Sequence, residues 1–135
     1  MQTITALIID DEEPARNLIK SYLTGHGEIK LLGECHDGYE GFRMIQQLRP
    51  DLIFLDVQMP KVTGFELLEI LDVPPAVIFT TAFDEFAIKA FEMNAVDYLL
   101  KPFSQARFDA ALQKAAEKIG AKNQAENNAI ARLVK

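Results

Sequence analysis

Cysteine is scarce in this sequence. A single thiol, Cys35, leaves no pair for an intrachain disulfide, so a reducing compartment, the cytoplasm, is expected. Long apolar runs are also missing, and none approaches the roughly 18 residues that a membrane-spanning helix needs. The first residues have no basic segment and run into acids at Asp10, which is not the pattern of a signal peptide. We therefore expect a cytoplasmic protein without membrane contact.

Positive charge is scarce in most of the chain. Residues 1–100 contain 7 Lys/Arg against 17 Asp/Glu, a net charge of −10. Because an acidic surface repels nucleic acid phosphates, this part is not expected to bind DNA. Residues 101–135 contain 7 Lys/Arg and 3 Asp/Glu, a net charge of +4. This end is either a solvated helix face or a linker towards something basic.

The length of 135 residues suits one domain with a short tail, and 49% apolar residues suffice for a core. Short apolar runs alternate with amphipathic segments. The runs are typical of strands covered on both faces and span Ile4–Ile9, Ile29–Cys35, Leu52–Leu55, Ala76–Thr80 and Val96–Leu100. Strands that alternate with helices predict an α/β fold, an open, doubly wound parallel sheet with right-handed crossovers.

Five helices are expected, one after each strand. Residues suited to the start of a helix precede or open each amphipathic segment: Pro14, Asp37 with Glu40, Thr63 with Glu66, Asp84 and Ser104. Gly120 is the predicted end of the last helix. Residues 121–135 are rich in Asn, Ala and Gln, and they are typical of a linker or a helical extension.

Polar residues follow four of the predicted strands: Asp10 and Asp11, then Asp56, then Thr81, then Lys101. Parallel strands place their carboxyl ends at one edge of the sheet, so these side chains are expected to gather there. Carboxylates about 5 Å apart repel by about 3 kcal/mol per pair at an effective dielectric constant of about 20. Such a cluster either retains a proton or binds a cation. An all-oxygen set without Cys or His favours Mg²⁺.

Phosphoryl transfer to a carboxylate accounts for the whole set. Asp56 follows a buried strand and is the best candidate nucleophile, which would form an aspartyl phosphate by in-line attack. Asp10 and Asp11 would then hold Mg²⁺, Lys101 would offset charge on the phosphoryl oxygens, and Thr81 would donate a hydrogen bond to one of them. Each residue alone is more typical of a helix cap, a loop or a strand. Their joint occurrence points to this chemistry.

The segments around these residues resemble the receiver domain of two-component response regulators. The resemblance covers about residues 3–119 and rests on residues 7–12 (LIIDDE), 51–60 (DLIFLDVQMP), Gly64, 79–82 (FTTA) and 97–103 (DYLLKPF). Residues 81–103 are similar, more narrowly, to receivers of the LytR/AlgR type, in which a LytTR DNA-binding domain follows. Residues 1–120 are therefore the expected receiver, and residues 121–135 a linker or helical extension towards an output domain absent from this chain.

The resemblance implies a flavodoxin-like receiver fold, with five helices around a five-stranded sheet of order 2-1-3-4-5. It also implies that Asp56 accepts phosphate from the histidine of a sensor kinase. Mg²⁺ would be bound by Asp11, Asp56 and the backbone carbonyl of Gln58, with Asp10 acting partly through water. The Lys101-Pro102 peptide bond would be cis, and Lys101 would pair with the phosphate.

In the same family, Thr81 and Tyr98 would be the switch pair, with the hydroxyl moving to the phosphoryl group while the ring turns inward. Gln58 and Phe83 flank the site and are expected to set how fast water removes the phosphate. The chain would be a switch limited to its own phosphorylation and dephosphorylation, and not a turnover enzyme. It would control transcription through DNA contacts made only by the missing output domain.

Homodimerisation is a further implication, through the fourth helix, the fifth strand and the fifth helix. That face is expected to carry opposite charges at Lys89, Glu92, Asp97, Arg107 and Lys114. A solvated charged face is the alternative interpretation.

Two other functions fit the pattern less well. A phosphohydrolase of the haloacid-dehalogenase kind also uses an aspartate after a strand, but it needs a second acid two residues later, where this chain has Gln58. A flavodoxin-like cofactor binder needs a loop rich in Gly, Ser or Thr after the first strand to hold the flavin phosphate. The acids from Asp10 to Glu13 would repel that phosphate.

Overall fold

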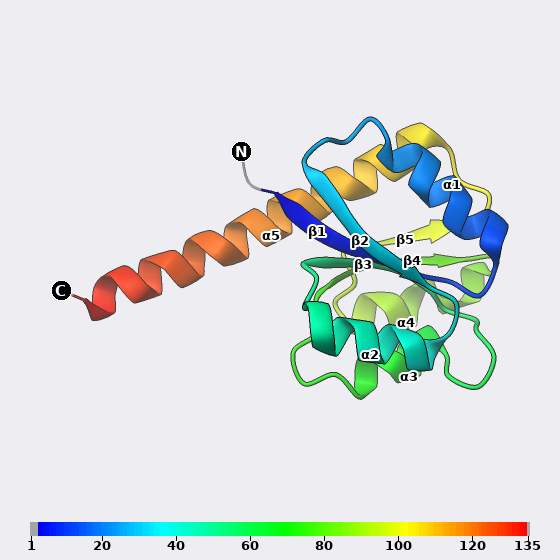
Figure 1. The fold of residues 1–135 in the computed structure, drawn as a ribbon, viewed down its shortest axis with the longest axis horizontal. Helices are drawn as coiled ribbons and strands as arrows, with labels where there is room; N and C mark the ends of the chain where they lie inside the picture. The colour runs from blue at the N-terminus through cyan, green and yellow to red at the C-terminus, as the bar shows by residue number, and fades with distance from the viewer. Residues whose placement is uncertain (1–2, 135) are drawn as a thin grey trace.

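Five parallel strands form one sheet in the order β2-β1-β3-β4-β5 in the computed structural model, which describes residues 3–134 (Figure 1). The strands are β1 (Ile4–Ile9), β2 (Ile29–Cys35), β3 (Leu52–Asp56), β4 (Ala76–Thr81) and β5 (Asp97–Leu100). Their bounds agree with the sequence prediction to within one residue at each end. The predicted flavodoxin-like fold and its strand order are confirmed.

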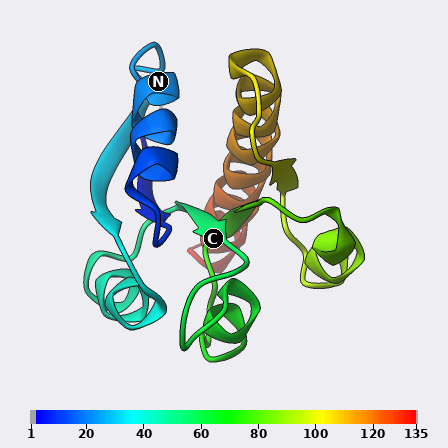
Figure 2. The same ribbon diagram turned by 90° about the vertical axis from the view of Figure 1, so that its right-hand side faces the viewer.

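Helices cover both faces of the sheet. They are α1 (Glu13–Leu23), α2 (Gly38–Leu48), α3 (Gly64–Glu69), α4 (Ala87–Glu92) and α5 (Gln105–Leu133), with a 3₁₀ turn, η1 (Asp84–Phe86), before α4. Figure 2 shows α1 and α5 on one face and α2, α3 and α4 on the other. Each face therefore has its own apolar core, with the sheet between them.

Four of the predicted helix starts are correct: Pro14 lies in the first turn of α1, and three capping side chains accept from a backbone N–H of their own helix. Thr63 and Glu66 form a reciprocal capping box at α3, and Ser104 accepts from the backbone N–H of Arg107 at 3.1 Å. The Asp37 carboxylate accepts from the Glu40 N–H at 2.8 Å, but the Glu40 side chain accepts from the His36 N–H instead of completing a box. Each of these three side chains, Thr63, Ser104 and Asp37, accepts a hydrogen bond from a backbone N–H that has no partner inside its helix.

Two helix boundaries differ from the prediction. Asp84 does not cap a helix, because it lies inside the 3₁₀ turn η1, whose N-cap residue is Phe83. Gly120 does not end α5, which continues to Leu133. One glycine inside a helix costs only about 1 kcal/mol, and the alanines, Gln124 and the charged residues that follow favour helix. The second half of α5 extends beyond the sheet, as Figure 1 shows in orange and red.

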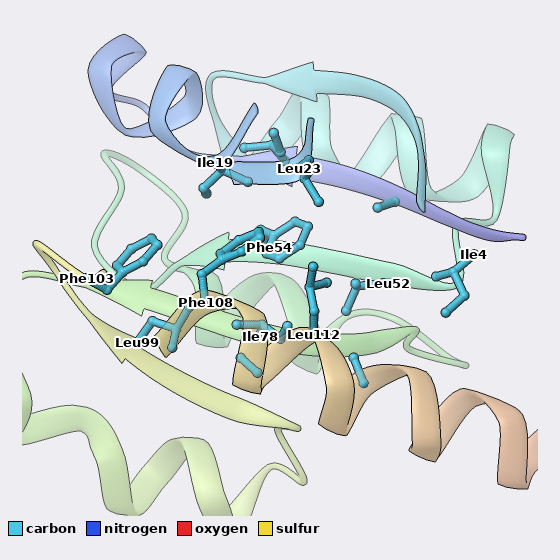
Figure 3. Packing of buried hydrophobic residues seen from close by; sticks show 14 of the residues in the cluster. Ile4, Ile19, Leu23, Leu52, Phe54, Ile78, Leu99, Phe103, Phe108 and Leu112 are labelled. Carbon is cyan, nitrogen blue, oxygen red and sulfur yellow. The ribbon is translucent and has the colours of Figure 1, made fainter. Parts of the chain in front are cut away.

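The core on the α1 and α5 face is built around aromatic rings. Phe108 of α5 stacks on Phe54 of β3 with ring centroids 5.4 Å apart, and on Phe103 at 6.2 Å (Figure 3). The Tyr22 hydroxyl donates to the Phe103 carbonyl at 2.8 Å, which ties α1 to the segment before α5. This packing holds the loop after β5 against α1.

The other face holds Cys35 at the end of β2. Burial raises the pKa of its thiol to about 12, so the thiol is un-ionised near neutral pH. Within residues 3–134 no helix is both long and apolar enough to cross a membrane.

Candidate functional site

The carboxyl ends of β1 and β3 bring acidic side chains together. Ile9 lies opposite Leu55 in the parallel ladder, so Asp10 and Asp56 follow side by side. Oxygens of Asp10, Asp11, Glu12 and Asp56 all lie within 4.8 Å of one another. The predicted gathering of strand ends is thus observed, with Glu12 as an additional member.

Asp56 is the last residue of β3 and is buried. One carboxylate oxygen, Oδ1, accepts from the Gln58 backbone N–H at 3.3 Å, and the other, Oδ2, lies 3.5 Å from Nζ of Lys101. Burial, together with the negative charge of Asp10, raises the pKa of Asp56 to about 7. An added cation would lower this pKa and keep the carboxylate ionised and nucleophilic at neutral pH.

Asp10 is fully buried, and each of its carboxylate oxygens has one partner. Its Oδ1 accepts from the Glu12 backbone N–H at 2.9 Å. Its Oδ2 forms an ion pair with Nζ of Lys101 at 2.9 Å and has no other partner among residues 3–134. A buried carboxylate oxygen whose one partner is an ammonium, beside three further acids, suits a hard divalent cation such as Mg²⁺. The residues present therefore fit the predicted ion.

Lys101 supplies the positive charge of the site. It follows β5, its backbone N–H donates to the Thr81 carbonyl at 2.7 Å, and its side chain is 16% exposed. Burial by itself would lower the pKa of Lys101, but the carboxylates of Asp10 and Asp56 outweigh burial and raise it. The Lys101-Pro102 peptide bond is cis, as the family resemblance implied.

Thr81 and Tyr98 meet at one loop residue. Thr81 is the buried last residue of β4, and its hydroxyl oxygen accepts from the Phe83 backbone N–H at 3.3 Å. The Tyr98 hydroxyl donates to the Phe83 carbonyl. The two hydroxyls predicted to act as a switch pair therefore contact the same peptide segment, between β4 and η1.

Glu12 is the residue at this site to which the sequence pattern assigned no role. It precedes α1 as the N-cap residue, and its Oε1 accepts from Lys101 at 3.2 Å. The sequence did contain a signal that Glu12 belongs to the site. Glu12 continues the run of acids after the first strand, and Pro14 keeps Glu12 just outside the helix. The contact itself joins residues 89 positions apart, which no local pattern reveals.

The comparisons with known proteins identify the family. The response regulator receiver domain family matches residues 6–113. This chain belongs to that family. It is the receiver domain of a two-component response regulator, and this family is not one of catalytic enzymes.

The receiver has close sequence relatives among regulatory proteins. It is 46% identical to the transcriptional regulatory protein BtsR of Escherichia coli K12 over 113 residues, which are 82% of this chain and 47% of that protein. A response regulatory protein of Vibrio cholerae is 45% identical over 82% of this chain and 48% of its own length. The chain thus spans about half the length of the curated relatives it matches.

Solved receiver structures share the fold. The response regulatory domain of mrkE from Klebsiella pneumoniae superposes with a TM-score of 0.80 at 30% identity, covering 87% of this chain and 99% of that one. The REC domain of AraT from Geobacillus stearothermophilus superposes with a TM-score of 0.82 at 29% identity, covering 90% and 99%. In both pairs the similarity spans nearly the whole neighbouring domain.

Proposed function

We propose that Asp56 is the phospho-acceptor of this receiver and takes its phosphate from the histidine of a sensor kinase. The observation that carries this proposal is the buried Asp56 carboxylate, with the Lys101 ammonium 3.5 Å from one oxygen. In the transfer, an Asp56 oxygen forms a bond to phosphorus while the bond from phosphorus to the donor nitrogen breaks. Lys101 then contacts the phosphoryl oxygens, whose charge it offsets.

Mg²⁺ is the proposed cofactor, held by Asp11, Asp56 and the Gln58 carbonyl, with Asp10 partly through water. The support is the all-oxygen cluster and the buried Asp10 Oδ2, whose partner among residues 3–134 is the Lys101 ammonium alone. When bound, the ion would neutralise charge on the phosphoryl oxygens. The chain's own residues position the nucleophile, because the Gln58 N–H holds one oxygen of Asp56.

Thr81 and Tyr98 are the proposed switch. The Thr81 oxygen accepts from the Phe83 N–H, so its own hydroxyl hydrogen is free to point at a phosphoryl oxygen. A turn of Thr81 towards the phosphate releases the Phe83 N–H, and the segment that also binds Tyr98 can then move. Inverting a two-state population from 1:99 to 99:1 takes about 5.5 kcal/mol. Two charge-assisted contacts, from Thr81 and Lys101, supply about 1.5–3 kcal/mol each.

Labelling by a small acyl phosphate tests the acceptor. With Mg²⁺, intact-mass spectrometry is expected to show one added phosphoryl group on the wild type and none on Asp56→Asn, because the amide is not a nucleophile. Asp72→Asn, which makes the same charge change at an exposed residue, should label as the wild type does. Chelation of Mg²⁺ should suppress the labelling. Equal labelling of Asp56→Asn and the wild type contradicts the proposal.

Apolar side chains on α4 and β5 support homodimerisation through the α4–β5–α5 face. Ile88, Phe91 and Leu100 are exposed there. The predicted charges are partly engaged within the chain, since Asp97 binds Arg107 at 2.7 Å and Lys114 at 3.2 Å. Burial by itself would raise the pKa of Asp97, but the Arg107 and Tyr98 hydrogen bonds outweigh it and lower the pKa. The exposed apolar side chains are therefore the main support for this interface.

Ile88→Asp is expected to weaken the phosphorylated dimer at least tenfold, because a charge would enter an apolar interface and remain unpaired. Sedimentation velocity with Mg²⁺ and beryllofluoride, which stands in for the phosphoryl group on Asp56, measures the effect. Val73→Asp is the matched control, since both side chains are 77% exposed and Val73 lies in the loop between α3 and β4. A dimer that tolerates Ile88→Asp would exclude this face.

The output is proposed to be transcriptional, through a DNA-binding domain of the LytTR type after α5. The support is that BtsR is a transcriptional regulatory protein about twice as long as this chain, and that α5 extends past the sheet towards the carboxyl end. DNA contact would then belong to that domain alone. We propose that the phosphotransfer takes place in the cytoplasm, and that the receiver itself catalyses only its own phosphorylation and dephosphorylation.

A further inference from the structure

Three carboxylates share the Lys101 ammonium, and the exposed one holds it with a hydrogen bond. Nζ donates to Glu12 Oε1 at 3.2 Å. Asp10 Oδ2 is nearer, at 2.9 Å, and Asp56 Oδ2 lies 3.5 Å away. The Glu12 side chain is 64% exposed, whereas the other two carboxylates are buried. Glu12 therefore holds the ammonium from the exposed side of the site, in competition with the buried Asp10 and Asp56.

The backbone of Glu12 is held in place. Its N–H donates to Asp10 Oδ1 at 2.9 Å, and its carbonyl accepts from the Arg16 N–H at 3.2 Å. Pro14, within the first turn of α1, restricts the chain that follows. The Glu12 carboxylate thus starts from a fixed point within reach of Lys101. Glu13, one residue later, is exposed, and its side chain makes no ion pair or hydrogen bond with another described residue.

We propose that Glu12 is a positioning residue that competes with the phosphoryl group for Lys101 and so opposes phosphorylation. The inference rests on the proposed role of Asp56. Before transfer, Glu12 and Asp10 both hold the ammonium. After transfer, the phosphoryl oxygens carry more negative charge than one carboxylate and attract the ammonium away from Glu12. Glu12 then keeps its own charge close to the phosphoryl group, which it repels.

The effect should be moderate and sensitive to salt. Exposed ion pairs contribute little to stability, so removal of the Glu12 charge is expected to favour the occupied state about three- to fivefold. Added salt screens the charge of the exposed Glu12 side chain. The difference between Glu12→Gln and the wild type should therefore shrink as ionic strength rises. A purely structural role for Glu12 would not produce this salt dependence.

Glu12→Gln and Glu13→Gln form a matched pair, since each removes one negative charge at neighbouring positions. The measurement is the dissociation constant of beryllofluoride at saturating Mg²⁺, by calorimetry, together with the half-saturating acyl phosphate concentration for labelling. Glu12→Gln is expected to lower both values about three- to fivefold relative to the wild type. Glu13→Gln should leave both values unchanged, and both variants should keep the wild-type melting temperature.

Several outcomes overturn the inference. Equal values for Glu12→Gln, Glu13→Gln and the wild type show that Glu12 does not compete for Lys101. Weaker beryllofluoride binding by Glu12→Gln, with a higher Mg²⁺ requirement, makes Glu12 a metal ligand instead. A failure of the proposed function is distinguishable, because Asp56 of the wild type would then remain unlabelled. Labelled wild-type protein with an unaltered Glu12→Gln variant refutes only the role of Glu12.

Discussion

Gly64→Ala is expected to lower the labelling rate of Asp56 about a hundredfold, because misplacing a reacting group by about 1 Å costs that much. Gly64 is the first residue of α3, and a Cβ atom there would lie 2.4 Å from the Asp56 backbone carbonyl oxygen. The Gly64 N–H also donates to the Val57 carbonyl at 2.9 Å. Since the nearest of these atoms belongs to the backbone of Asp56 and cannot turn aside, β3 and α3 must move apart, and Asp56 moves with them.

The same variant should lose about 2–3 kcal/mol of unfolding free energy, the usual cost of overpacking a closed site. Urea unfolding gives the stability, and acyl phosphate labelling at a temperature where the variant is folded gives the rate. Gly25→Ala is the control, because a Cβ atom at Gly25 meets nothing within 4 Å. A folded Gly64→Ala protein that labels at the wild-type rate would show that the carbonyl contact does not position Asp56.

Phe108→Ala is expected to reduce the unfolding free energy by about 3–5 kcal/mol, the range for deletion of a buried phenylalanine ring. Phe108 is fully buried, and its ring contacts Phe54, Phe103 and Tyr22 with centroid distances of 5.4, 6.2 and 5.4 Å. Its loss leaves a cavity between the sheet and α5 that these rings cannot fill together. The loss is a large part of the 5–15 kcal/mol that stabilises a typical domain.

Equilibrium unfolding in urea measures this loss, with Phe91→Ala as the control. The Phe91 side chain is 81% exposed on α4, so the same chemical change should stay within about 0.5 kcal/mol of the wild type. A Phe108→Ala protein as stable as Phe91→Ala would mean that the aromatic cluster contributes little to the stability of α5 on the sheet.

Much of the fold was predictable because it depends on local patterns. Runs such as Leu52–Leu55 are apolar at every position, and strands buried on both faces require that. Helix ends were less predictable. Gly120 is a common end residue, but it lies within α5 because neither its neighbours nor its backbone require a turn there. Asp84 has a side chain suited to capping, yet η1 begins at Asp84 itself, so the N-cap position falls on Phe83.

Part of the site followed from topology. In a parallel sheet with this strand order, the residues after β1 and β3 must be neighbours, which places Asp10 beside Asp56 without any knowledge of side-chain positions. The topology did not reveal which charged residues pair with one another. Asp97 was expected among the charges of a dimer face or of a solvated face, whereas in the fold it binds Arg107 and Lys114 of its own chain.

The sequence by itself determined the strands, the gathering of acids at one edge and the family, because these depend on the order and type of residues along the chain. Only the tertiary structure decided that Glu12 shares Lys101 with Asp10 and Asp56, and that Gly64 has no room for a methyl group beside the Asp56 carbonyl. Such contacts depend on differences of less than 1 Å between segments far apart in the chain. Packing of the whole domain sets those distances, and no segment alone contains them.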